Sequence, residues 1–166
     1  MTSVERKKDQ PTWLDMGLAD LRKLETTSKG VLPSPEIIDE GENHEHALAL
    51  LIHYLELEDL DQRTITTVVG EVLILKNKLE HIVAKRQDAR ERYVKFALAT
   101  MLTPYEIWKV EYETGVMRLA FIGVFDGKRQ MLVVVNTEDG HVLWNFMHCD
   151  RSSLNKHRNG ELIHRQ

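Results

Sequence analysis

The chain has 166 residues, 42% of them hydrophobic, which is enough for a domain with a real core, and it contains no apolar run long enough to span a membrane. Its one cysteine, Cys149, excludes an internal disulfide and a multi-cysteine zinc site, as expected for a reducing cytosol. The net charge of −4 is uneven, because residues 1–75 hold 7 Lys and Arg against 15 Asp and Glu, whereas residues 76–166 hold 15 against 11.

The acidic first part of the chain is expected to form helices around a linker. Thr12 and Asp15 resemble a capping box and leucines follow at helical spacing, so the sequence predicts a short helix across Trp13–Glu25. Glycines and prolines in residues 26–42 indicate a linker. Asn43 is then placed to cap a second helix with an apolar stripe.

A β-hairpin and a long helix are expected next. Thr64–Val69 is rich in β-branched residues, Gly70 stands at the position of the turn, and Glu71–Leu75 forms the returning strand, a pattern typical of a hairpin. The following residues predict one helix over about Lys78–Met101. Pro104 would end it, because proline cannot continue the helical hydrogen bonds and restricts the residue before it.

The remainder of the chain predicts four strands and a short helical turn. The strands are expected at Glu106–Glu113, Met117–Phe125, Met131–Asn136 and Val142–His148. Met131–Val135 is apolar at every position, which indicates a central strand covered on both faces. Ser152–His157 resembles a helical turn.

These elements predict an α+β fold. N-terminal helices and a hairpin would be followed by a long helix packed on a four-stranded antiparallel sheet. We expect an acidic helical segment with its linker at residues 1–62 and a second domain at residues 63–166.

The predicted long helix carries residues suited to proton transfer and phosphate binding. His81, Lys85 and Arg92 would share one of its faces, and a histidine can act as an acid or a base near neutral pH. A helix on an antiparallel sheet with His, Lys and Arg converging can cleave RNA without a metal, through a base, an acid and cations around the phosphorane. The alternative is that His81 only caps or packs at the start of the helix.

The second part of the chain also resembles a known family. It contains, in this order, the runs TVVGEVLILKNKLEHIVAKRQDARERY, LTPYEIW, FIGVF, MLVVV, WNFM and LNKHRNGEL. Over about Thr67–Leu162 these runs resemble the phage-encoded nuclease-like domain grouped with barnase, EndoU, colicin-type and RelE-type ribonucleases, which occurs at the C-terminus of minor head proteins of Mu-like phages. The resemblance implies a helix on a four-stranded sheet and metal-independent RNA cleavage, and it places His81 in an HI-x-x-KR element.

Four residues form the predicted catalytic set: His81, Lys85, Arg118 and Arg158. Arg118 is the only charge in its strand and points away from Leu119, and the family tends to keep an arginine there, so we interpret it as a phosphate clamp, with a structural ion pair as the alternative. Arg158 would stabilise the transition state, unless it locks the C-terminal turn through backbone carbonyls.

Five further residues are predicted to bind substrate: Arg86, Asn145, Trp144, Asn155 and Lys156. Arg86 either reaches the substrate or pairs with a carboxylate such as Glu106. Trp144 could stack on a base, although a strand tryptophan is more often part of the core. Asn145 would read a base edge, orient the phosphate or bond to a neighbouring loop.

Three functions fit this set of residues. The first is a metal-independent endoribonuclease that attacks through the 2′-hydroxyl and leaves a 2′,3′-cyclic phosphate. The second is a non-catalytic head-morphogenesis module, and the third is a nucleic-acid binder that does not cut. The catalytic set favours the enzyme. No metal or other cofactor is expected, because His44 and His46 diverge on a helix and make a poor site with His53.

RNA is therefore the expected partner of the basic half, and no membrane partner is expected. The acidic half could bind a phage head or portal protein or an immunity-like protein, or it could mask the basic face of its own chain. The corresponding location is the cytoplasm of a bacterial host or the virion.

Overall fold

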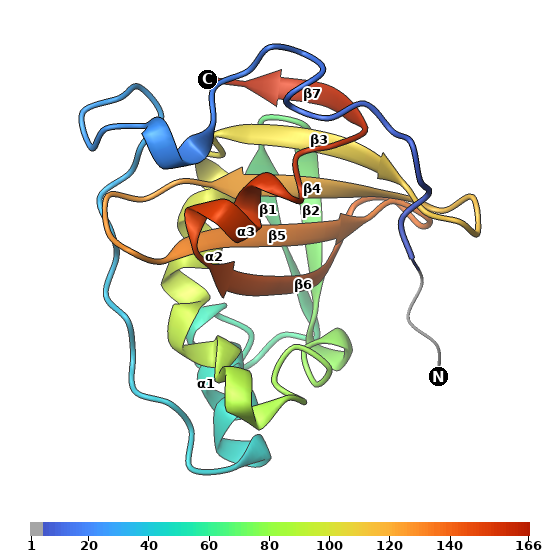
Figure 1. Cartoon of the computed structure of the whole chain (residues 1–166). Helices are drawn as coiled ribbons and strands as arrows, with labels where there is room; N and C mark the ends of the chain where they lie inside the picture. Colours follow the sequence, from blue (N-terminus) through green and yellow to red (C-terminus); the bar gives the residue numbers. More distant parts are fainter. Residues whose placement is uncertain (1–4) are drawn as a thin grey trace.

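The computed structural model describes residues 5–166, which fold around a seven-stranded sheet (Figure 1). The strands are β1 (Gln62–Thr67), β2 (Gly70–Leu75), β3 (Glu106–Glu111), β4 (Met117–Gly123), β5 (Gln130–Asn136), β6 (Val142–Cys149) and β7 (Glu161–Arg165). Their order is β1-β2-β6-β5-β4-β3-β7, and every pair is antiparallel except β2 with β6. The α+β class is confirmed. The four-stranded antiparallel sheet is corrected: strands β3 to β6 are present, but the hairpin β1–β2 and β7 extend them.

Within the described residues, three α-helices accompany the sheet: α1 (His44–Tyr54), α2 (Val94–Leu102) and α3 (Arg151–Asn155). In Figure 1, α1 and α2 lie on one side of the sheet, while α3 lies on the other side together with the N-terminal part of the chain. The buried apolar residues divide in the same way, into a large cluster with α1 and α2 and a smaller one with α3 and Leu21. Within residues 5–166, no helix is both long and apolar enough to cross a membrane.

Strand β5 lies at the centre of the sheet, between β6 and β4. Met131 and Val133 belong to the cluster under α2, and Leu132 and Val134 belong to the opposite cluster. The prediction of a central strand covered on both faces is therefore confirmed, and the alternation follows from the two-residue period of a strand.

The predicted long helix over Lys78–Met101 is wrong. Only α2 is α-helical there; the preceding residues form turns and the 3-10 segments Lys76–Lys78, Arg86–Asp88 and Arg90–Tyr93. Ala89 has φ of +42°, a left-handed conformation that a continuous helix excludes. Leu79, Ile82 and Val83 are all buried in the large cluster, which shows that packing overrides helix propensity in this segment. His81, Lys85 and Arg92 consequently do not share a helical face.

The helix predicted at Trp13–Glu25 is also wrong, although its capping box forms. The Thr12 amide donates to Asp15 Oδ2 at 2.9 Å, and the Asp15 amide donates to Thr12 Oγ1 at 3.4 Å. Gly17 then adopts φ of +68°, which ends the turn, and only Leu21–Lys23 is helical, as a single 3-10 turn.

The other local predictions agree with the structure. Asn43 caps α1 by accepting a hydrogen bond from the His46 amide at 2.9 Å, and residues 26–42 contain neither helix nor regular strand. The hairpin is present as β1 and β2, with Gly70 at φ of +104°. The division into two domains at residue 62 remains a prediction. Leu32, in the predicted linker, forms a β-bridge with Phe125, which follows β4.

Candidate active site

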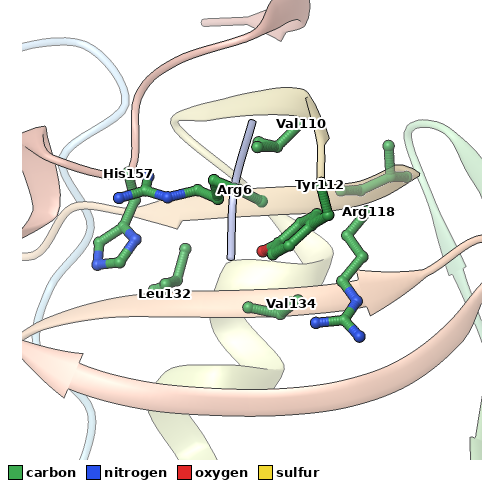
Figure 2. Close-up of a pocket in the computed structure, with 9 residues that line it drawn as sticks. Arg6, Val110, Tyr112, Arg118, Leu132, Val134 and His157 are labelled. Atoms are coloured by element: carbon green, nitrogen blue, oxygen red, sulfur yellow. The ribbon is translucent and has the colours of Figure 1, made fainter. Parts of the chain in front are cut away.

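A small cavity lies on the face of the sheet opposite α2 (Figure 2). Its lining consists of Arg6, Val110, Tyr112, Arg118, Leu119, Ala120, Leu132, Val134 and His157, and it encloses about 20 Å³. A wider depression of about 440 Å³ adjoins it, shares several of these residues and adds Glu5 and Met147. We call the two together the basic hollow, because Arg6, Arg118 and His157 stand over an apolar floor. The wider part has the volume of an ordinary small-molecule site.

Strand periodicity builds the floor of the basic hollow. Along β4, Ala120 and Ile122 face the smaller cluster, whereas Leu119 and Phe121 belong to the cluster under α2. Arg118 is two residues before Ala120 and therefore emerges on the same face, as the sequence predicts.

Arg118 is held between two aromatic rings. Its guanidinium carbon lies 4.7 Å from the centre of the Tyr112 ring and 5.1 Å from that of Trp144. Its Nε is buried without a hydrogen-bond partner among residues 5–166, and no ion pair of these residues includes it. A cation stacked in this way keeps its charge available for an anion.

His157 lies at the other end of the basic hollow. Burial, together with the charges of Arg6 and Lys156, lowers the pKa of His157 from 6.5 to about 4. Figure 2 shows its ring beside the Arg6 guanidinium, with Tyr112 between these two residues and Arg118. The imidazole is therefore neutral at pH 7.

His81 joins this arrangement through Trp144. The His81 ring contacts the Trp144 ring at a centroid distance of 4.9 Å, and its Nε2 donates to the Trp144 carbonyl. Burial is the largest cause of the lowered pKa of His81, and the positive charges of Lys78 and Arg90 lower this pKa further. The hydrogen bond to the Trp144 carbonyl acts in the opposite direction. With the proton on Nε2, the neutral ring has its lone pair on Nδ1. His81, Trp144, Arg118 and Tyr112 thus form a continuous row of contacts, and Tyr112 lines the small cavity together with His157.

The sequence of the chain matches a family model over residues 49–165, and the model is described as phage-Barnase-EndoU-ColicinE5/D-RelE like nuclease2. The chain belongs to this nuclease-like family. Comparison with curated proteins and with solved structures finds no match.

This member of the nuclease-like family brings together three of the predicted site residues: His81, Trp144 and Arg118. Lys85 is exposed and begins a 3-10 turn. Arg86 pairs with the buried carboxylate of Glu91 through contacts of 2.8 and 2.7 Å. A carboxylate partner for Arg86 was one of the two expected alternatives, but the partner is not Glu106.

Arg158 lies in a different environment from His81. It is 1% exposed, and its Nε and Nη2 donate to the two carboxylate oxygens of Glu106 at 2.7 and 2.8 Å. Its Nη1 donates to the Ala19 carbonyl and to Asn155 Oδ1. Burial and partners for all three guanidinium nitrogens give Arg158 a structural environment, and Asn155 belongs to the same network.

The remaining predicted residues have other partners. Asn145 accepts a hydrogen bond from Arg90 Nη1 at 2.9 Å and from the Phe146 amide. The side chain of Lys156 is exposed, while its carbonyl accepts from Arg6 Nη1 at 2.8 Å. Within residues 5–166, no three His, Cys, Asp or Glu side chains are grouped so that they could hold a metal ion.

Sequence reasoning missed three residues of the basic hollow: Arg6, Tyr112 and His157. His157 stands inside the run LNKHRNGEL, next to the Arg158 that was chosen, so the signal for it was present. Tyr112 falls within the predicted strand Glu106–Glu113, in which no functional residue is expected. Arg6 carries no signal, because its neighbours in space are more than a hundred residues away along the chain.

Proposed function

We propose that this protein is an endoribonuclease that cleaves RNA without a metal ion, by attack of the 2′-hydroxyl on the adjacent phosphate. One observation supports this most: His157, Tyr112 and Arg118 line one hollow, and none of the residues around its small cavity is a carboxylate. A neutral base and a free guanidinium that line the same hollow are what phosphoryl transfer to an internal hydroxyl requires. The membership of the nuclease-like family supports the same conclusion.

In this proposal His157 accepts the 2′-hydroxyl proton while the oxygen forms a bond to phosphorus. The bond from phosphorus to the 5′-oxygen breaks, and the Tyr112 hydroxyl donates its proton to the leaving oxygen. Arg118 stabilises the extra negative charge on the phosphorane. His157 and Tyr112 return to their starting states by proton exchange with water, and the products are a 2′,3′-cyclic phosphate and a 5′-hydroxyl.

His81 and Trp144 lie beside this centre and would contact the neighbouring nucleotide. A structural role is proposed for Arg158, Asn155 and Arg86, because the side chain of each is hydrogen-bonded within the protein. A phage or prophage origin and an intracellular RNA substrate complete the proposal.

Incubation of the purified protein with total RNA in EDTA tests the proposed function. We expect 2′,3′-cyclic phosphate ends, detected by end-group analysis, and a loss of at least about a hundredfold in rate for His157→Ala, because general base catalysis contributes on this scale. The matched control is His141→Ala, which changes a histidine that does not line the basic hollow.

Absence of cleavage at every pH would overturn the enzyme and favour the non-catalytic head-morphogenesis module. Equal rates for the wild type and His157→Ala would overturn the assignment of the base. Retention of intact RNA with a steep salt dependence would indicate a binding protein.

A further inference from the structure

The N-terminal residues 5–13, here called the arm, lie outside the part of the chain that matches the family, residues 49–165. The arm is nevertheless bonded to the sheet by backbone hydrogen bonds. The Lys7 amide donates to the Glu111 carbonyl at 2.9 Å, and the Glu113 amide donates to the Glu5 carbonyl at 2.9 Å. These bonds continue the sheet beyond the end of β3 and fix the position of the residue between Glu5 and Lys7.

Two further contacts attach the rest of the arm. The Gln10 side chain bonds to both the amide and the carbonyl of Glu111, at 2.8 and 2.9 Å. The Gly160 amide donates to the Pro11 carbonyl at 2.8 Å, and Thr12 pairs with Asn159. The arm is thus held at both ends, by β3 and by the loop before β7.

Arg6 is the arm residue that enters the basic hollow. Its backbone pairs with Tyr112, and its side chain lines both the small cavity and the wider depression with His157. Nη1 donates to the Lys156 carbonyl at 2.8 Å, which fixes the guanidinium beside His157 (Figure 2). A guanidinium has five N–H donors, and the bond to the Lys156 carbonyl uses one of them.

Arg6 and Arg118 enter the hollow from separate elements. Figure 2 places them at opposite ends, with Tyr112 between them. Two guanidinium groups separated by an aromatic ring match a nucleic acid strand better than a single free phosphate, because consecutive phosphates need separate cations and the base between them needs a flat surface.

We propose that Arg6 is a phosphate-binding residue of the ribonuclease site, supplied by a segment outside the family match. This inference rests on the proposed function. Single-stranded RNA is the ligand: Arg118 binds the phosphate that reacts, and Arg6 binds a neighbouring phosphate next to His157.

The test measures binding separately from cleavage. A short fluorescein-labelled single-stranded RNA with 2′-O-methyl groups cannot be cut by 2′-hydroxyl attack, so fluorescence anisotropy with the full chain reports affinity alone. The variants are Arg6→Gln, Arg118→Gln and Arg6→Lys. Lys7→Gln is the matched control, because it removes the same charge from the adjacent arm residue, whose side chain pairs with Glu111 instead.

We expect Arg6→Gln to weaken binding about fivefold at 0.1 M salt and to reduce the slope of log K against log salt by about 0.7, the value for one phosphate contact with a single strand. Lys7→Gln should leave the slope unchanged, and Arg6→Lys should restore it. Thermal unfolding of each variant shows whether the arm is still folded: a lost slope with an unchanged melting temperature supports phosphate binding.

The outcomes separate the two proposals. If the wild type binds and cleaves RNA but Arg6→Gln behaves like Lys7→Gln, the role of Arg6 is overturned and the ribonuclease stands. If Arg6→Gln loses affinity only because it unfolds, and Arg6→Lys does not restore the slope, the arm is structural and the inference is overturned. If the wild type neither binds the RNA nor cleaves unmodified RNA, both proposals fail.

Discussion

At the scale of single residues, the main contrast is between charged groups that have protein partners and those that face the hollow. Arg158 and Glu106 are both 1% exposed and bonded to each other. Arg118 is stacked between rings and its Nε has no partner within the described chain, residues 5–166. Binding an anion would satisfy Arg118, whereas Arg158 is already satisfied. This difference is the physical reason for assigning chemistry to one arginine and folding to the other.

Replacement of Arg158 should therefore affect stability more than chemistry. Arg158→Ala leaves the buried Glu106 carboxylate without its partner, and we expect the free energy of unfolding to fall by about 3–5 kcal/mol in urea denaturation. The fraction that stays folded should cleave RNA at the normal rate. Full stability combined with lost activity would instead return Arg158 to the catalytic set.

His157 should also make stability depend on pH. Its pKa is lowered to about 4 in the folded protein from an ordinary 6.5, so between these values the unfolded state binds more protons. The free energy of unfolding should therefore decrease as the pH falls from about 6.5 to about 4, by up to about 3 kcal/mol for this residue. Urea titrations across this range should show a shallower dependence for His157→Gln, and equal curves would contradict the assignment.

At the scale of elements, strands β1 to β6 were predictable, whereas β7 and the structure of the segment before α2 were not. Strand β5, for example, contains a run of β-branched residues, which is typical of a strand. The segment before α2 has good helix formers, but Leu79, Ile82 and Val83 are drawn into the core and the chain folds into turns. Strand β7 was missed because its five residues show little apolar pattern and form a strand only beside β3.

The candidate site was predictable to a similar extent. Arg118 could be chosen because a lone charge in an apolar strand needs an explanation, and the structure places it on the expected face. Arg158 was preferred to its neighbour His157, although burial, which decides between them, is invisible in a sequence. Arg6 could not be found, because only the tertiary fold brings the arm to Tyr112.

The contact between β4 and α2 depends on a glycine. A Cβ at Gly123 would collide with the side chain of Thr100 on α2. Gly123→Ala should lower the free energy of unfolding by about 1–3 kcal/mol, as expected for an overpacked core. A double-mutant cycle with Thr100→Ala, measured by urea unfolding, should show that the second change recovers part of the loss. Strict additivity of the two changes would contradict this contact.

At the scale of the whole molecule, the two faces of the sheet differ in how far they are covered. Helices α1 and α2 cover one face and bury the large cluster, whereas the opposite face is only partly covered by α3 and the N-terminal residues. The basic hollow lies in the uncovered part. The expected masking of the basic face by the acidic half stays a prediction, and the arm residue nearest to His157 is an arginine.

The way in which β3 is covered affects how the protein could be shortened. Strand β7 pairs with Glu106–Lys109, and the arm bonds to Glu111 and Glu113 just beyond. Two segments that are distant in the sequence, β7 and the arm, thus pair with β3 and the residues just after it. A fragment cut to the family boundaries would expose unpaired backbone groups at the end of β3, and such groups promote association with other chains. Such a fragment would also lose Leu21, Ile38 and Ala47, which are buried in the two clusters, so its aggregation would reflect both the uncovered strand and a depleted core.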